Sequence, residues 1–270
     1  MRRTFSQIRD LHPTRRHVLF SAGSVLGIAI LGTTACSPSE SGPAATSSGD
    51  GSTPDSSGSG PSGGETGLVW QQASMGFVSA YVLVRAHEAA IVDTGADGSD
   101  AQTAIASALS SVGSDWDAVQ HIVLTHRHGD HVGGLPTVAT DAPSAALYAG
   151  ADDIAEITAP DGRQLTPLAD GTEIFGLQII GTPGHTPGHV SVFDPTTGVL
   201  VAGDALRTTD GLQGSDPQYT ADQGAAAESV RKLAQLNVTA ILPGHGPPLT
   251  TDAAGALSTL ADSIQIPAST

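Results

Sequence analysis

The densest group of side chains that could do chemistry lies in residues 125–131. Four of these seven residues carry groups that bind metals, namely His126, His128, Asp130 and His131. Imidazole nitrogens and carboxylate oxygens together form a ligand set typical of zinc. A regular strand or helix could not direct all four at one ion, whereas a loop could turn His126 and His128 toward one metal and Asp130 and His131 toward a neighbour. The alternative is a surface histidine tract with incidental metal affinity.

Further candidate ligands come in similar contexts later in the chain. His185 and His189 each follow a Pro-Gly pair within residues 182–189, Asp204 ends an apolar run, and His245 follows another Pro-Gly pair. Apolar runs of this length predict strands, and side chains at strand ends are where the active site of an α/β sheet is usually built. This repetition favours a metal centre over an incidental tract.

Small and turn-forming residues accompany these candidates. Gly129 is expected to permit a sharp backbone path within the histidine cluster, and Gly133 and Gly134 to allow a close approach just beyond it. Asp93 begins an Asp-Thr-Gly turn after an apolar run, and it either forms the turn or supports the site.

The elements that must position these residues alternate along residues 67–270. Short apolar and β-branched runs predict strands at 68–70, 79–84, 89–92, 121–124, 145–148, 173–180, 190–193, 198–202 and 240–242. Helical spacing of apolar residues predicts helices at 99–113, 222–236 and 251–263, the first stopped by Gly113. Strands outnumber helices but the two are interleaved, which indicates a layered α/β domain.

The order of these motifs resembles the metallo-β-lactamase superfamily. His-x-His-x-Asp-His at 126–131 is preceded by Asp93-Thr94-Gly95 and followed by a histidine, an aspartate and a histidine in the family's order. All five of the family's usual signatures are recognisable, and the resemblance covers residues 67–270. It implies an α/β fold built as a four-layer αββα sandwich, with a two-metal centre at one edge.

The resemblance also implies a role for each candidate residue. By analogy, the first metal is bound by His126, His128 and His185, the second by Asp130, His131 and His245, and Asp204 bridges both. Two Zn²⁺ per chain, with iron or manganese as alternatives, would share a water and lower its pKa toward 7, so that a hydroxide attacks the substrate. Asp130 is expected to orient this hydroxide and accept a proton. Asp93 is expected to orient a ligand histidine, a role that metal sites generally require, and His189 to support the ligands from behind.

Fold resemblance does not fix the substrate. Asp204 stands where the name-giving β-lactamases of the common subclasses carry Cys or Ser, so antibiotic hydrolysis is disfavoured and the glyoxalase II and lactonase-like branch is favoured. Only 25 residues follow His245, too few for a helical domain that grips glutathione. We therefore expect a hydrolase of small ester, thioester or lactone substrates. Tyr219 and Arg207 either contact the substrate or lie on the surface.

Two other functions remain open on the sequence. A mononuclear iron sulfur dioxygenase of the same fold would use His126 or His128 with His185 and Asp204, whereas retention of Asp130, His131 and His245 favours two metals. A non-catalytic metal-binding lipoprotein is the other alternative, although every ligand position is filled.

The charge balance excludes some partners. Residues 67–270 hold six basic and 22 acidic residues, a formal charge of −16. Nucleic-acid binding needs a basic footprint, which is missing here. The expected partner is a small-molecule substrate, while the oligomeric state stays open.

The N-terminal residues have a different character. Five arginines and an apolar stretch from Val18 to Leu31 within residues 1–35 are typical of an export signal, and Arg15-Arg16 resembles the twin-arginine signature. The stretch is too short to span a bilayer; Sec export and a buried helix are the alternatives. Residues 31–36 resemble a bacterial lipobox, in which Cys36 would be lipidated and anchor the protein to the outer face of the cell membrane. A structural thiol is the alternative.

Residues 37–66 consist almost wholly of Ser, Gly, Pro, Thr, Ala and a few acids. Such a segment has no apolar surface to offset the entropy of ordering, so we expect a disordered linker. The only membrane contact expected is then through the N-terminal lipid, with the acidic domain held away from anionic lipid.

Overall fold

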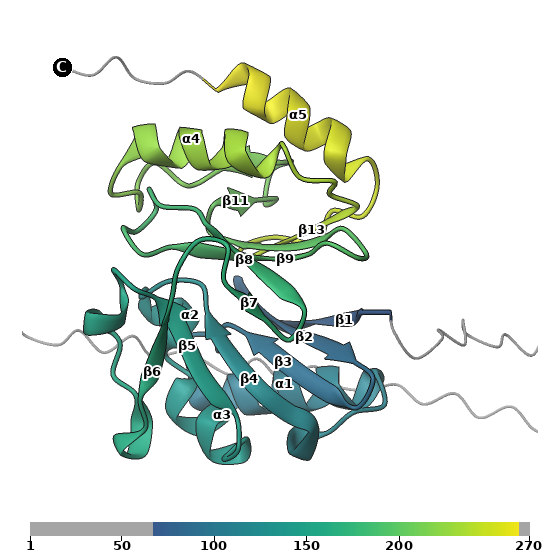
Figure 1. Ribbon diagram of the computed structural model, residues 1–270, viewed down its shortest axis with the longest axis vertical. Helices are drawn as coiled ribbons and strands as arrows, with labels where there is room; N and C mark the ends of the chain where they lie inside the picture. Colours follow the sequence, from purple (N-terminus) through teal and green to yellow (C-terminus); the bar gives the residue numbers. More distant parts are fainter. Residues whose placement is uncertain (1–66, 265–270) are drawn as a thin grey trace, which may run out of the picture. The chain divides into compact units, whose positions relative to one another are not determined.

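Two β-sheets pack face to face and carry helices on their outer sides in the computed structural model, which describes residues 67–264 (Figure 1). The predicted export signal, the linker and Cys36 lie outside the described residues, as do residues 265–270. None of the described helices combines the length and the apolar character that crossing a membrane requires.

The first sheet has the strand order β1-β2-β3-β4-β5-β6. Its members are β1 (Val69–Met75), β2 (Val78–Arg85), β3 (Glu88–Val92), β4 (Val119–Leu124), β5 (Ala146–Gly150) and β6 (Leu165–Leu168). The first three strands pair antiparallel through tight hairpins, and β3 to β6 run parallel. The parallel strands are joined by crossovers that contain α1 (Gly98–Ser111), α2 (Gly129–Val132) and α3 (Leu135–Asp141).

The second sheet has the order β13-β10-β9-β8-β7. Its members are β7 (Glu173–Ile174), β8 (Leu177–Gly181), β9 (Val190–Asp194), β10 (Val199–Gly203) and β13 (Ala240–Pro243). Strands β10 and β13 run parallel and the other pairs antiparallel, so β8, β10 and β13 end at the same edge. A two-stranded ribbon of β11 (Leu206–Arg207) and β12 (Gln213–Gly214) leads to α4 (Gln223–Leu233), and α5 (Ala253–Ser263) closes the described chain.

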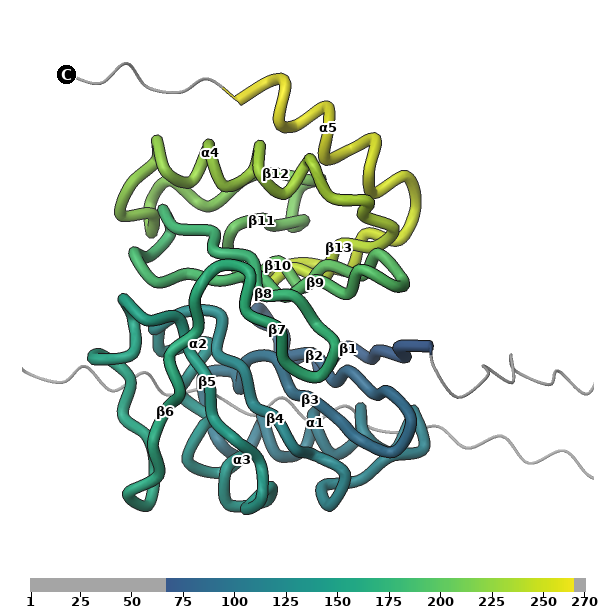
Figure 2. Tube along the Cα trace, viewed as in Figure 1, coloured from purple at the N-terminus to yellow at the C-terminus, as the bar shows by residue number. Residues whose placement is uncertain are grey.

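Figures 1 and 2 show the order of the four layers, with a sheet against a sheet and helices on the outer sides. Three hydrophobic clusters fill the three interfaces between these layers. Side chains alternate along each strand, so Val82 of β2 packs against α1, whereas its neighbour Tyr81 packs between the sheets. Likewise Val201 of β10 faces the first sheet and Leu200 faces α4 and α5. Both faces of these strands are buried, which explains their nearly continuous apolar runs. The expected αββα sandwich is confirmed.

Most of the predicted elements are present, with one correction. Residues 173–180 were expected to form one strand, but Phe175 and Gly176 adopt φ of 56° and 69° and split it into the β7–β8 hairpin. A left-handed pair of this kind matches the twist of a two-residue hairpin, which the apolar run concealed. Helices α1 and α4 begin where expected because Asp97 and Asp222 cap them, with side chains that accept from Ser99 N and Ala225 N.

Candidate metal centre

Seven histidine and aspartate side chains converge where the two sheets meet. His126 and His128 follow β4, Asp130 and His131 lie in α2, and His185 follows β8. Asp204 comes directly after β10 and His245 shortly after β13. The structure therefore brings together every residue proposed to hold metal, because loops at the carboxyl ends of strands in both sheets point into one space.

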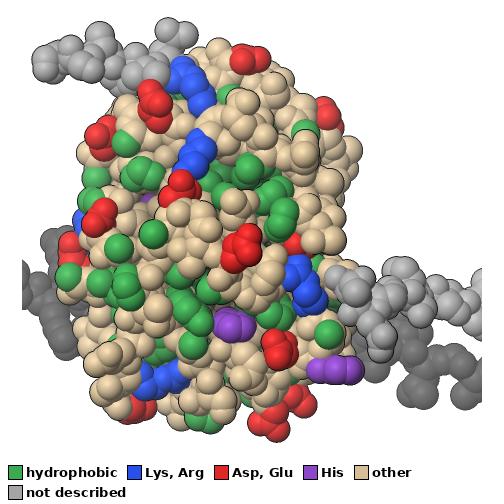
Figure 3. Space-filling model, in the orientation of Figure 1, with side chains coloured by type: hydrophobic (Ala, Val, Ile, Leu, Met, Phe, Trp, Pro, Cys, Tyr) green, Lys and Arg blue, Asp and Glu red, His purple; other side chains and the backbone are tan. Residues whose placement is uncertain are grey.

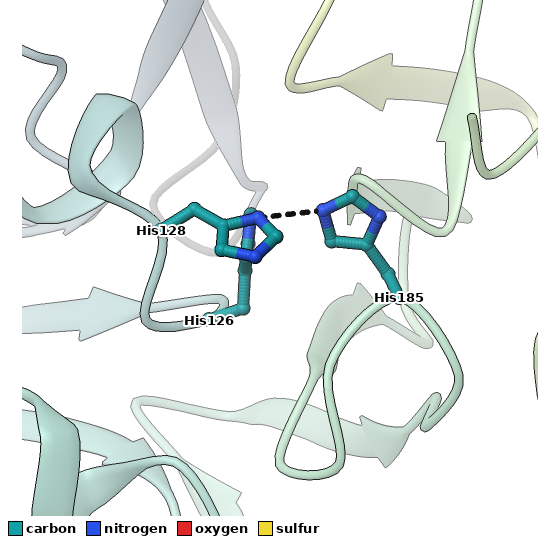
Figure 4. Close-up of side chains that lie close together, drawn as sticks. All are labelled: His126, His128 and His185. Carbon is teal, nitrogen blue, oxygen red and sulfur yellow. Dashed lines mark hydrogen bonds between the residues drawn. The ribbon is translucent and has the colours of Figure 1, made fainter. Parts of the chain in front are cut away.

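Three of these histidines form the first group of donor atoms. Nδ1 of His128 lies 3.1 Å from Nε2 of His126 and 2.9 Å from Nε2 of His185. Figure 4 shows the three imidazoles turned toward one another, His185 from one side and the other two from the opposite side. Zinc–nitrogen bonds of 2.0–2.1 Å at tetrahedral angles place ligand nitrogens roughly 3.3 Å apart. The spacing of these nitrogens therefore fits one tetrahedral cation.

The second group joins α2 to the loop after β13. Oδ2 of Asp130 lies 3.4 Å from Nε2 of His245 and 3.8 Å from Nε2 of His131. His131 is fully buried, while Asp130 and His245 are partly exposed to the cavity. The group could hold a second cation with two nitrogens and a carboxylate.

Asp204 lies between the two groups. Its Oδ2 is 3.3 Å from Nε2 of His185 in the first group and 3.2 Å from Nε2 of His245 in the second. Its Oδ1 is 3.3 Å from Nε2 of His131. One carboxylate thus faces donors of both groups, which is the position that a bridging ligand requires.

Hydrogen bonds behind His126 fix which of its ring nitrogens is free. The hydroxyl of Thr125 donates to Oδ2 of Asp93 over 2.8 Å, so its oxygen can only accept from Nδ1–H of His126, 3.0 Å away. Nε2 of His126 is then unprotonated and faces the other donors. The tautomer follows from the direction of the donated protons rather than from the ring position alone.

A similar relay lies behind His185. The hydroxyl of Thr220 donates to the carbonyl of Asp216, so the hydroxyl of Ser215 donates to Thr220 and accepts from Nδ1–H of His185. The two links to Ser215 are each 2.8 Å long. Nε2 of His185 is therefore also free to bind a cation.

Two of the other three rings donate from Nδ1 to a carboxylate or to a backbone carbonyl oxygen. Nδ1–H of His131 donates to Oδ2 of Asp93 over 2.7 Å, and Nδ1–H of His245 donates to the carbonyl of Phe77 over 2.8 Å. Asp93 also accepts from the backbone N–H of Thr125. Asp93 thus contacts a histidine of the cluster, and four imidazoles have Nδ1 engaged and Nε2 turned toward the centre.

Two buried polar atoms at the centre show that these donors fit a cation. Nε2 of His131 and Oδ1 of Asp204 are buried without a hydrogen-bond partner. A buried donor or acceptor without a partner costs free energy, and in native proteins such groups are rare. A divalent cation would satisfy both atoms together, so the residues present fit a metal centre.

The charges in the cluster support the same conclusion. Hydrogen bonds with Asp130 and Asp204 raise the pKa of His245 to about 10. The hydrogen bond from His245 in turn lowers the pKa of Asp130, and burial lowers the pKa of His185 to about 4. The two carboxylates are therefore ionised at neutral pH and draw compensating positive charge, which a divalent cation supplies by displacing a proton.

His189 lies behind Asp204 and completes a directed chain of hydrogen bonds. Its Nε2 accepts from the backbone N–H of Asp204 over 3.0 Å, so Nδ1 is protonated and donates to Oγ1 of Thr182 over 2.8 Å. Thr182 then donates to Ser191, whose hydroxyl donates to the carbonyl of Ala202. Burial lowers the pKa of His189 to about 3, which keeps the ring neutral. His189 therefore holds the backbone that carries Asp204, in the supporting position expected for it.

Asp153 is a further site residue, which the sequence analysis missed. It is fully buried after β5, and its carboxylate accepts from the backbone of Arg127 and Gly188 and from the hydroxyl of Thr186. It thus ties the loop of His126 and His128 to the loop of His185. The one feature of the sequence that could have indicated Asp153 is its position shortly after a predicted strand. Other aspartate and glutamate residues share that position, so it did not single out Asp153.

Glycines were expected to matter in the first loop, and one expectation is wrong. Gly129 has ordinary helical backbone, and a Cβ there would meet no atom within 4 Å. Gly133 and Gly134 do pass close to other backbone, since a Cβ would lie 2.2 Å from the carbonyl oxygen of Ala96 and 2.0 Å from that of Thr94. Gly244 matters more directly, because a Cβ there would lie 2.3 Å from Oδ1 of Asp204.

A cavity of about 520 Å³ opens over the centre. Five of the seven proposed ligands line it (His128, Asp130, His185, Asp204 and His245), and the rest of the wall is formed by Phe77, Gly129, Arg207, Asp216 and Tyr219. Arg207 and Tyr219, the two residues considered for substrate contact, both lie on this wall. No serine, cysteine, threonine or lysine is among the lining residues. The cavity thus gives a small molecule access to the candidate metal centre but offers it no side-chain nucleophile of those types.

Comparison with known proteins gives consistent matches. The family model described as "Metallo-beta-lactamase superfamily" matches residues 73–245. The "Probable metallo-hydrolase YflN" of Bacillus subtilis is 31% identical over 232 residues, which cover 69% of this chain and 85% of that protein. Among solved structures, the family protein TTHA1429 of Thermus thermophilus superposes with a TM-score of 0.56 at 24% identity, covering 73% of this chain and 77% of that one. The structure of TTHA1623 in a di-iron-bound form superposes with a TM-score of 0.52 at 27% sequence identity, and the match covers 68% of this chain and 93% of that one.

Removing metal should destabilise the folded protein. Chelation leaves the buried atoms of His131 and Asp204 without a partner, and a ligand present at 1,000 times its Kd stabilises by about 4 kcal/mol. For a domain of this size we expect the Tm to fall by on the order of 10 °C in EDTA and to recover with added Zn²⁺, measured by differential scanning calorimetry. The matched control is Asp204→Ala, whose Tm should respond weakly to either treatment. A wild-type Tm that changes with neither EDTA nor Zn²⁺ would contradict the assignment of these residues as a metal centre.

Proposed function

Because the chain belongs to the metallo-β-lactamase superfamily and is a metallohydrolase of that fold, we propose that it is a dinuclear zinc hydrolase of small ester, thioester or lactone substrates. The observation that carries the proposal is the set of hydrogen bonds that engages Nδ1 of four histidines and turns Nε2 of each toward two carboxylates. A purely structural histidine cluster would not need these four rings turned the same way.

Two features support a centre with two metals rather than one. Asp130, His131 and His245 form a second donor group of their own, which a mononuclear iron dioxygenase would leave unused. The structural neighbour TTHA1623 is itself described in a di-iron-bound form. Iron therefore stays the alternative metal, within the same two-metal arrangement.

The chain's own residues prepare the attack of water. Bound divalent metal supplies Lewis acidity and brings the pKa of a bound water toward 7. Asp130 is ionised, half-buried and faces the cavity, so its carboxylate can orient the attacking water and accept a proton from it. Asp93 and Ser215 hold the rings of His131 and His185 in place through Nδ1. Since the lining residues include no serine or cysteine, water is the nucleophile that the site favours.

Replacing Asp130 should affect turnover far more than folding. Asp130→Asn keeps the shape of the side chain but loses the charge that accepts the proton, and we expect kcat to fall by about 10²–10⁴-fold. The substrates to measure are p-nitrophenyl esters, acyl-thioesters, lactones and nitrocefin, with metal content and Tm determined in parallel. Asp152→Asn, at an exposed position outside the cavity, is the matched control. Near-normal turnover by Asp130→Asn on a substrate that the wild type cleaves would refute the role of Asp130.

We also propose that the protein is exported and anchored by lipid on Cys36, which rests on the sequence of residues 1–36 alone. The wild type produced in a bacterial host should partition into detergent and carry the mass of a lipidated chain that begins at Cys36. Cys36→Ala should lose both properties, as measured by detergent partitioning and intact mass. A Cys36→Ala form that stays in the membrane fraction would refute the anchor.

A further inference from the structure

Two aromatic side chains stand exposed on the wall of the cavity. Within residues 67–264, the large apolar side chains that are exposed are Val69 at 51%, Phe77 at 66% and Tyr219 at 61%. Single exposed apolar residues are common and carry little meaning. Here two of the three line the same cavity over the candidate metal centre, while Val69 lies outside it. Their shared location indicates an apolar surface for a ligand.

The contacts behind Phe77 hold it rigidly beside the centre. It occupies the turn between β1 and β2, its carbonyl accepts from His245, and its ring stacks on the imidazole of His245 with centroids 6.0 Å apart and planes 7° apart. The next part of the hairpin is held too, because the backbone N–H of Ser79 donates to the carbonyl of Gly244. The backbone of Phe77 is therefore anchored beside the centre, and its ring lies against His245 with most of its surface exposed.

Tyr219 lies in the turn between β12 and α4, where its backbone is held by a hydrogen bond. Its backbone N–H donates to the carbonyl of Asp216, which also accepts from the hydroxyl of Thr220. Thr220 is linked through Ser215 to His185. The backbones of both aromatic residues are thus connected by hydrogen bonds to histidines of the centre, and both side chains line the cavity that His128, His185 and His245 also line.

The charges of the wall indicate what kind of molecule this is. Among the lining residues, Arg207 is the single arginine or lysine, and its guanidinium is paired with Asp216 at 2.6 Å. Asp130 and Asp204 face the metal positions, where bound cations would offset their charge, while residues 67–264 as a whole hold 22 acidic and six basic residues. On the face shown in Figure 3 the few basic side chains are scattered and do not form a patch. Away from the metal positions, the wall therefore offers no unpaired cation to a carboxylate at the far end of a substrate, and a carboxylate held against Phe77 and Tyr219 would lose water without gaining a partner.

We infer that the cavity takes neutral substrates whose apolar acyl chain lies against Phe77 and Tyr219 while the carbonyl faces the metal centre. The inference rests on the proposed hydrolase function and specifies its substrate class. Acyl chains of medium length should be preferred over acetyl groups, and substrates that end in a carboxylate should be disfavoured.

Matched esters test this preference in the metal-loaded full chain. We expect kcat/KM for p-nitrophenyl octanoate to exceed that for the acetate, and to exceed by about tenfold or more that for the mono-p-nitrophenyl ester of octanedioic acid. Phe77→Ala and Tyr219→Ala should each reduce the octanoate-to-acetate ratio by about tenfold. Val69→Ala, outside the cavity, should leave kcat/KM unchanged for both the octanoate and the acetate.

A second measurement separates the binding surface from the chemistry. Methyl ketones from acetone to 2-decanone have no bond that the enzyme can hydrolyse, and their binding can be followed by saturation-transfer NMR. Binding that strengthens with chain length and is lost in Phe77→Ala and Tyr219→Ala supports the inference. If such binding is seen but no ester is cleaved, the hydrolase proposal is refuted and the apolar binding surface is not. Equal binding and equal turnover at all chain lengths, or a preference for the octanedioic ester, would overturn the inference.

A separate observation concerns Asp153, and we propose it as the positioning residue of the three-histidine group. Its two oxygens accept from the backbone N–H of Arg127 over 3.1 Å and from that of Gly188 over 2.9 Å. Arg127 stands between His126 and His128, and Gly188 follows His185 in the same loop. No hydrogen bond links Asp153 to the loops or helix of Asp130, His131 and His245, within the part of the chain that the structure describes. Asp153 therefore sets the spacing of one donor group and not of the other.

Stepwise metal titration of the demetallated full chain tests this role. With Zn²⁺ and a chromophoric competitor, Asp153→Ala should weaken one of two binding steps by about 10–100-fold and leave the other within about threefold. Asp153→Asn, which keeps the shape and one acceptor, should show a smaller change and covers the case in which the alanine variant does not fold. His245→Ala should weaken the other step, and the double variant should lose both. Equal weakening of both steps, or none in any Asp153 variant, would overturn the proposal.

Discussion

The central constraint on this molecule is the convergence of two carboxylates and five imidazoles, buried or partly buried, in one small space where the two sheets meet. The most deeply buried of these atoms include Nε2 of His131 and Oδ1 of Asp204, which lie 3.3 Å from each other and have no further hydrogen-bond partner in the described part of the chain. Such a cluster is unfavourable by itself and becomes favourable around divalent cations. The cost of assembling the donors is met elsewhere, by three hydrophobic clusters that hold the four layers together.

The scaffold controls the donors through directed hydrogen bonds rather than through packing alone. Asp93 adopts a φ of 65°, which lets its carboxylate reach both Thr125 and His131 across the end of β4. His189 fixes the backbone of Asp204, and Asp153 joins the loops from the two sheets. These residues do not need to touch substrate. They determine which ring nitrogen is free and how far apart the donors lie, and metal sites depend on both.

Much of this could be predicted from the sequence, for identifiable reasons. Apolar runs followed by His or Asp located β4, β8, β10 and β13 with their ligands, because a strand buried on both faces reads as a continuous apolar stretch. The β7–β8 hairpin was missed because Phe175 takes a left-handed conformation that its residue type does not announce. Asp153 was missed because its role depends on backbone groups of distant loops, which leave no trace in local sequence. The supporting hydroxyls of Ser215 and Thr220 were missed for the same reason, and so was the position of Phe77 in a hairpin turn against His245.

The most direct test of this account is anomalous X-ray scattering from crystals of the protein loaded with zinc, combined with the metal content per chain in solution. We expect two ions per chain, with Asp204 bound to both. One ion should lie among His126, His128 and His185, and the other among Asp130, His131 and His245. A single ion, or ions located away from Asp204, would contradict it.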